Sequence, residues 1–136
     1  MADLQITAGP EVFEASFATA APKTFAAFRD RLPFVSRIVH VRWSGEAVWA
    51  PLGDLDFGIG AENATSYPAP GQILLYPGGV SETEIIIAYG PCQFASKAGQ
   101  LAGNHFLTID SGLDRLGELG RLTLWQGAQP IRFELV

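Results

Sequence analysis

Apolar and polar residues alternate along the segment IVHVRWSGEAVWAPL, residues 38–52. The odd positions carry its apolar members, Val39, Val41, Trp43, Ala47 and Trp49, and the even positions carry its polar members, His40, Arg42, Ser44 and Glu46. An alternation of period two is typical of a β-strand that packs one face against a core. Because Ser-Gly falls in the middle of the segment, we expect a hairpin with strands over residues 36–43 and 46–52.

Two loop lengths fit this hairpin. A connection of three residues places all five apolar residues on one face, whereas a connection of two residues brings Glu46 opposite Trp43. We favour the three-residue connection, because it keeps a carboxylate off the apolar face.

Further strand-like segments follow along the chain, and Gly- or Pro-containing turns separate most of them. They cover residues 4–8, 12–18, 72–76, 84–89, 103–109, 122–125 and 131–135. Two segments are predicted to be helical. In PKTFAAFRDRLPF, Phe25, Phe28 and Leu32 share one helical face, Pro22 suits the first turn and Pro33 ends the helix. A second short helix is expected from Ser111, as N-cap, to a stop at Gly120.

This order of elements predicts a mainly β fold. A chain of 136 residues suits a single domain, residues 1–136, and can bury a sizeable core. About eight short strands and two short helices indicate a closed or nearly closed eight-stranded antiparallel barrel, with a helix at each mouth.

Composition excludes several classes of partner. The net charge of −5 argues against nucleic acid, which is bound through many Lys and Arg contacts to phosphate. The longest apolar run, residues 85–89, is too short to cross a membrane. Cys92 is the single cysteine and no signal-like segment opens the chain, so we expect a cytoplasmic protein without disulfides. Two histidines without ligand spacing predict no metal and no cofactor.

The polar residues of the hairpin are the first candidate site. His40 and Arg42 lie two apart on a strand, so their side chains are expected to point the same way. A neighbouring guanidinium favours a neutral imidazole that accepts protons, and Arg42 can hold a carboxylate with two parallel hydrogen bonds. The alternative is an exposed strand face on which Glu46 pairs with Arg42.

The segment FASKAGQLAGNHF, residues 94–106, is the second candidate. Lys97, Gln100, Asn104 and His105 lie there among small residues that let a ligand approach the backbone. This combination would suit an anionic small molecule, and the alternative is a tight loop packed on the barrel. The irregular stretch of residues 53–71 is long for a loop, and its part ENATSYP, residues 62–68, would form a lid over the same cleft, with Tyr67 as an aromatic wall. The alternative is a surface loop in which Asn63 and Ser66 form turns.

Several motifs resemble known families. A strand hairpin followed by APKTFAAFRDRLPF is similar to the start of a cyclophilin, and the Leu-Pro ending of that helix, the WSGE hairpin and the GQILLY strand are similar to small bacterial cyclophilin-like proteins. The segments RWSGEAVW, ENATSYPAPG, YPGG and FASKAGQLAGNHF resemble an uncharacterised bacterial family, domain of unknown function 3830. These resemblances imply a cyclophilin-like barrel over nearly the whole chain, but no activity.

The cyclophilin resemblance also raises the question of peptidyl-prolyl cis-trans isomerase activity. Cyclophilins carry F-H-R after the first helix, and the arginine donates hydrogen bonds to the substrate proline. The corresponding segment here is Val35-Ser36-Arg37, and the Q-G-G-D motif is absent. Arg37 is therefore the residue on which an isomerase activity would depend.

The sequence as a whole favours one function over two alternatives. We expect a protein that binds a small anionic or amide metabolite in a cleft at the side of the barrel, and the residues leave open whether it also transforms this ligand. Arg42 and Lys97 would hold charge, and His40 or His105 would handle protons. The alternatives are the isomerase and a non-catalytic assembly module, in which Trp-bearing strands form the interface of a homo-oligomer.

Overall fold

The computed structural model describes residues 2–136. In chain order the elements are β1 (Leu4–Ala8), β2 (Glu11–Phe17), α1 (Pro22–Arg29), β3 (Phe34–His40), β4 (Gly45–Gly53), β5 (Ala64–Thr65), β6 (Gln72–Tyr76), β7 (Thr83–Cys92), β8 (Ala95–Ser96), β9 (Gly99–Gln100), β10 (Gly103–Ser111), α2 (Leu113–Gln126) and β11 (Gln129–Leu135). The strands predicted at residues 4–8 and 72–76 are confirmed with the same bounds.

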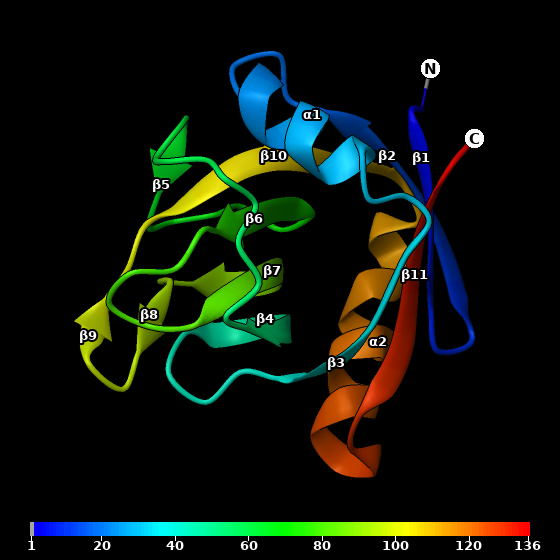
Figure 1. The fold of residues 1–136 in the computed structure, drawn as a ribbon. Helices are drawn as coiled ribbons and strands as arrows, with labels where there is room; N and C mark the ends of the chain where they lie inside the picture. Colours follow the sequence, from blue (N-terminus) through cyan, green and yellow to red (C-terminus); the bar gives the residue numbers. More distant parts are fainter. Residues whose placement is uncertain (1) are drawn as a thin grey trace.

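Eight antiparallel strands close into a barrel, as predicted. The hydrogen-bonded order is β2-β1-β11-β3-β4-β7-β6-β10, and β10 returns to pair with β2, which closes the sheet. The short strand β5 adds to the other end of β10, and β8 and β9 form a separate small hairpin. Figure 1 shows the two helices at different places on the barrel, α1 next to β10 and α2 next to β3. Closure leaves the eight barrel strands without an open edge.

The β3–β4 hairpin keeps the predicted faces but not the predicted loop. Val39 lies opposite Trp49 in the ladder, and the Val41 N–H donates to the Ala47 carbonyl over 3.1 Å. The two strands therefore stop pairing beyond Val41 and Ala47, although β4 itself begins at Gly45, which pairs with Cys92 of β7. Trp43 lies in the connection, with 56% of its surface exposed. Relative to a three-residue loop the pairing is shifted by two positions. A shift by an even number leaves every side chain on its original face, so the apolar face survives.

The second helix is longer than the sequence predicted. Gly120 does not stop it, and residues 122–125, predicted as a strand, form its last turns. A Cβ at Gly120 would lie 2.3 Å from the ring of Tyr89, so the glycine lets the helix pass close to the barrel. The helix ends instead at Gly127, whose φ is 88°. Its N-cap is Gly112, since Ser111 still belongs to β10.

The inside of the barrel is filled by apolar side chains from every strand of the closed sheet and from both helices. Phe28 of α1 is fully buried there, and its ring contacts those of Phe34, Phe57, Phe106 and Phe133. On the other helix, Leu116 and Leu119 belong to the same core. Each helix is thus held by side chains that enter the barrel.

The sheet of β4, β7 and β6 is buried on both faces. Its outer face carries a second apolar cluster that includes Ala47, Leu74 and Ile86, and Phe94 and Leu101 cover that cluster from the segment after β7. Strands buried on both sides read as continuous apolar runs, which explains the composition of β6 and β7. The covering segment 93–101 stops short of the start of β7, and the candidate site lies at that uncovered end.

Candidate functional site

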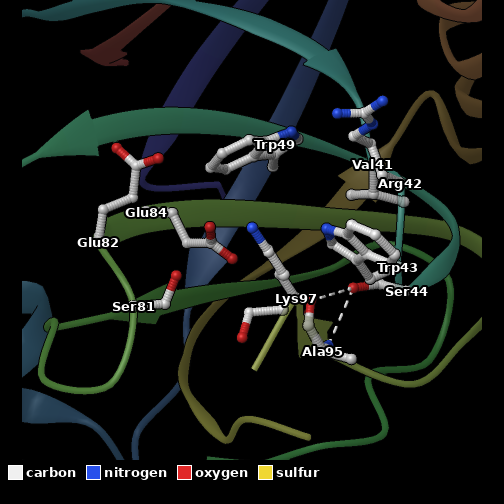
Figure 2. A pocket seen from close by; sticks show the side chains of 11 residues that line it. Val41, Arg42, Trp43, Ser44, Trp49, Ser81, Glu82, Glu84, Ala95 and Lys97 are labelled. Atoms are coloured by element: carbon white, nitrogen blue, oxygen red, sulfur yellow. Dashed lines mark hydrogen bonds between the residues drawn. The ribbon is translucent and has the colours of Figure 1, made fainter. Parts of the chain in front are cut away.

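A cavity of about 180 Å³ opens on the outer face of β4 and β7 (Figure 2). Three segments meet around it: the β3–β4 connection, the start of β7 with the residues before it, and the β8–β9 hairpin. Its lining residues are Val41, Arg42, Trp43, Ser44, Trp49, Ser81, Glu82, Glu84, Ala95, Ser96 and Lys97. A second hollow, lined by residues 53–56 and 77–79, shares Ser81 and Glu82 with the cavity. The walls thus combine two indole rings with charged groups of both signs.

Ser44 holds two sides of the cavity together. Its Oγ donates to the Ala95 carbonyl over 3.1 Å and accepts from the Ala95 N–H over 3.0 Å, as Figure 2 shows. The carbonyl of Ser44 also accepts from the Gln93 N–H over 2.9 Å. These three bonds fix the β3–β4 connection to the start of the β8–β9 hairpin. They therefore bring residues that are far apart in sequence, Arg42 and Lys97, to the same cavity.

Glu84 is the most unusual residue of the lining. It lies on the outer face of β7, between Tyr76 of β6 and Pro51 of β4 in the two ladders, and only 7% of its surface is exposed. Within residues 2–136 its carboxyl group forms no hydrogen bond and no ion pair, yet none of its oxygens is sealed in the core. The carboxyl group thus faces the cavity without a partner.

The electrostatics of Glu84 follow from this position. Burial, together with the neighbouring charge of Glu82, raises the pKa of Glu84 to about 8. Burial disfavours the charged form of an acid because the interior solvates it poorly, and a second carboxylate adds repulsion. Near neutral pH the group is therefore largely protonated, and it can both donate and accept a hydrogen bond.

The two cations of the cavity are held differently. Lys97 lies in the exposed turn between β8 and β9, and in Figure 2 its side chain reaches into the cavity with the ammonium group between Glu84 and Trp43. Arg42 lies at the rim, and its guanidinium points away from the other lining groups. Among the described residues neither cation forms an ion pair. Both are free to turn toward an anionic group of a ligand.

His40 does not join Arg42 at this cavity. Its Nε2 lies 2.7 Å from the Tyr89 hydroxyl and its Nδ1 2.8 Å from the Val41 carbonyl, on the side of the sheet where α2 packs. Burial raises the pKa of Tyr89, and the charge of Glu46 adds to this effect while Arg121 opposes it. The strand turns His40 toward the helix, whereas Arg42 lies beyond the end of the ladder. The predicted pair is thus separated.

Two further predicted residues hold the loop of residues 53–71 in place. Asn104 is fully buried, where its amide donates to the Gly60 carbonyl and accepts from the Glu62 N–H. His105 is half-buried; its backbone N–H donates to the Asn63 carbonyl over 3.2 Å, and its ring Nε2 lies 2.8 Å from the Thr108 hydroxyl. Burial lowers the pKa of His105, while a backbone hydrogen bond with Leu107 opposes this shift. Both residues lie on β10, outside the cavity lining.

The other predicted residues also lie outside the cavity lining. Gln100 is exposed and accepts a hydrogen bond from Gln93. Tyr67 and Arg37 are exposed, and Glu46 lies over the backbone of Gly90. Of the nine residues named from the sequence, the structure thus brings only Arg42 and Lys97 together at this cavity.

Glu84, Glu82 and the role of Ser44 were not predicted from the sequence. Glu84 directly precedes the apolar run of residues 85–89. An acidic residue next to such a run could have been predicted to be buried. Ser44 read only as a turn residue, because its partner Ala95 is remote in sequence. Within residues 2–136, no three His, Cys, Asp or Glu side chains are grouped as a metal site. No helix in the same range is long and apolar enough to span a membrane.

The fold resembles that of a solved structure of McbB in complex with tryptophan. The two superpose with a TM-score of 0.74 at 16% sequence identity, over 96% of this chain and 44% of McbB. The chain thus spans less than half of the length of that protein, and the likeness concerns the fold. No curated protein matches the chain. The model of one protein family, described as protein of unknown function (DUF3830), matches residues 7–135, and the chain therefore belongs to this family.

Proposed function

We propose that this protein binds a small organic molecule with a carboxylate or amide group in the cavity between the β3–β4 connection, β7 and the β8–β9 hairpin. One observation carries the proposal: Arg42 and Lys97 both line a hollow that the carboxyl group of the nearly buried Glu84 also faces, and within residues 2–136 this carboxyl group has no hydrogen-bond partner. Small-molecule sites typically combine apolar walls with a few convergent polar groups, and perturbed acids gather at such sites.

The size and the walls of the cavity indicate the scale of the ligand. An engineered cavity of about 150 Å³ in another protein holds benzene, so a hollow of this size accepts a molecule with one ring. The indoles of Trp43 and Trp49 offer flat apolar surfaces for such a ring. The likeness to McbB, whose structure contains tryptophan, is in keeping with a barrel of this type that binds a small molecule.

Binding of model compounds tests the proposal. We expect 3-phenylpropionate and its amide to shift the indole N–H signals of Trp43 and Trp49 in a nuclear magnetic resonance titration. Trp125 is exposed at the end of α2 and serves as an internal control whose signal stays in place. Arg42→Ala and Lys97→Ala should each weaken binding of the carboxylate by about tenfold, because each removes a charge-assisted hydrogen bond.

The matched control is Arg37→Ala, which removes an exposed arginine of β3 that does not line the cavity. This variant should bind 3-phenylpropionate as the unchanged protein does. Equal shifts at all three indoles, or equal weakening by Arg37→Ala, would show that the compound binds elsewhere. The isomerase and the assembly module stay predictions from the sequence.

A further inference from the structure

We propose that the ligand of this cavity also carries a protonated amine, which binds beside Glu84, so that the site selects small zwitterions of the amino-acid type. This inference rests on the proposed function and deepens it. It concerns the chemical class of the ligand: an amine at the acidic side of the cavity, a carboxylate toward Arg42 and Lys97, and a small apolar body against the indoles.

Glu84 has no partner within the described part of the chain, and its carboxyl oxygens are open only toward the cavity. Such a group obtains its hydrogen bonds from whatever occupies the cavity, and a ligand can replace water there. Glu84 is 93% buried, faces the cavity and has no partner within residues 2–136. A ligand that brings a charged donor to this carboxyl group would satisfy it. A charged donor such as an ammonium group forms a hydrogen bond to a carboxylate that is about twice as strong as that of a neutral donor.

Charged residues of opposite sign lie on different sides of the cavity. Figure 2 shows Glu82 and Glu84 on one side of the cavity and Trp43 and Arg42 on the other. A ligand with one negative group satisfies only the cationic side, and would place its remaining surface against two acids. A zwitterion matches both sides at once, and complementary charge at both ends also fixes its orientation.

The ammonium group of Lys97 already enters the cavity. The side chain of Lys97 extends between Glu84 and Trp43. It comes from an exposed turn and forms no ion pair within the described range, so it can move aside at little cost. A ligand ammonium would take its place beside Glu84, and Lys97 would then reach the ligand carboxylate.

Amine binding of this kind is linked to pH. Burial raises the pKa of Glu84 to about 8, so the free protein holds a proton there that an incoming ammonium would expel. The other titratable groups near this carboxyl group are Glu82 before β7, Lys97 and Arg42 in the two loops, and Tyr76 on β6. Affinity for an amine should therefore rise with pH as Glu84 loses its proton.

Three probes that share a phenyl group on a two-carbon chain separate the two charged groups. L-phenylalanine carries both the amine and the carboxylate, 3-phenylpropionate only the carboxylate, and 2-phenylethylamine only the amine. Titrations at about pH 6.5 and about pH 8.5 should show that L-phenylalanine binds best. Affinity for 2-phenylethylamine should rise by about tenfold between the two pH values, whereas affinity for 3-phenylpropionate should not rise.

Two variants and one control assign the effect to residues. In Glu84→Gln, the affinity for 2-phenylethylamine should no longer rise with pH, and at the higher pH it should be about tenfold lower than in the unchanged protein. Glu14→Gln, on an exposed position of β2, should change nothing. Lys97→Ala alters only an exposed turn, so its folding is not at risk. This variant should bind 3-phenylpropionate more weakly, and its affinity for 2-phenylethylamine should be unchanged or higher.

The outcomes separate this inference from the proposed function. If only 3-phenylpropionate binds, the site does not select zwitterions, but the proposed function stands. The same holds if the affinity of Glu84→Gln for 2-phenylethylamine still rises with pH. If Lys97→Ala lowers the affinity for both 3-phenylpropionate and 2-phenylethylamine, a ligand ammonium does not replace that of Lys97 beside Glu84. Failure of all three probes to shift Trp43 and Trp49 would overturn both.

Discussion

Glu84 shows how one residue links the fold to a site. Its place in β7 is set by the apolar run that follows it, whose side chains pack on both faces of the sheet. The strand therefore carries the carboxyl group into a nearly buried position at the end of that run. The surrounding cavity gives the group space for a ligand, and no residue in the range 2–136 donates a hydrogen bond to it.

The burial of Glu84 should make stability depend on pH. Because burial raises the pKa of Glu84 from 4.5 to about 8, the folded protein retains a proton that the unfolded chain releases. The free energy of unfolding should fall as pH rises from about 4.5 to about 8, by roughly 2 to 4 kcal/mol, and then level off. Urea denaturation of the unchanged protein and of Glu84→Gln, followed by tryptophan fluorescence, measures this contribution as the difference between the two.

The difference between these proteins isolates Glu84, because the contributions of other groups cancel. His105 is one such group: its pKa is lowered by burial, so its contribution to stability is lost as pH falls through about 6.5. Parallel stability curves for the unchanged protein and Glu84→Gln would mean that the carboxyl group does not hold its proton in the folded state.

At the scale of elements, α2 depends on two glycines with different roles. Gly120 lies against the ring of Tyr89, and this contact lets the helix approach β7 closely. Gly117 is one turn earlier, and a Cβ there would meet only the flexible end of Arg121 at 3.4 Å. Glycine weakens a helix interior in both cases. Only at Gly120 does packing against another element compensate for that cost.

Alanine substitutions should therefore have opposite effects at the two positions. Gly120→Ala should lower the free energy of unfolding by about 1 to 3 kcal/mol, since the new methyl group overlaps three ring atoms of Tyr89. Gly117→Ala should raise it by about 0.5 to 1 kcal/mol through helix propensity. Urea denaturation of both variants decides the matter, and a change of the same sign in both would contradict the role given to Gly120.

At the scale of the whole molecule, the barrel has two separate apolar clusters with the sheet of β4, β7 and β6 between them. The inner cluster fills the barrel and contacts both helices, and the Phe28 ring lies at its centre. The outer cluster is covered by the segment after β7. Since the cavity lies on the outer side, the chain can keep a site there without a hole in its main core.

Removal of the Phe28 ring should affect the whole fold. Phe28→Ala should lower the free energy of unfolding by about 3 to 5 kcal/mol, because the fully buried ring joins α1 to aromatic residues of β3, β10 and β11. Phe17→Ala is the matched control, since that ring is 36% exposed and stacks only on Phe25. Thermal unfolding should show a clearly smaller loss for the control, and equal losses would argue against Phe28 as the centre of the core.

The sequence by itself determined the local elements of this protein. Strand-like segments next to turn residues predict the strands at residues 4–8 and 72–76, the second as a nearly continuous apolar run, and the proline that opens α1 is visible directly. The closed barrel could also be predicted, because many short strands in one domain need closure to hide their edges. The apolar face of the β3–β4 hairpin survived a wrong loop length, since the shift was even.

Only the tertiary structure decided the candidate site and the length of α2. Gly120 reads as a helix stop until the ring of Tyr89 occupies the space beside it, and Ser44 reads as a turn residue until Ala95 lies within hydrogen-bond distance. Similarly, Glu84 becomes a buried acid only when β4, β6 and the β8–β9 hairpin surround it. Local periodicity reports which face of an element is apolar, whereas partners remote in sequence determine what that face meets.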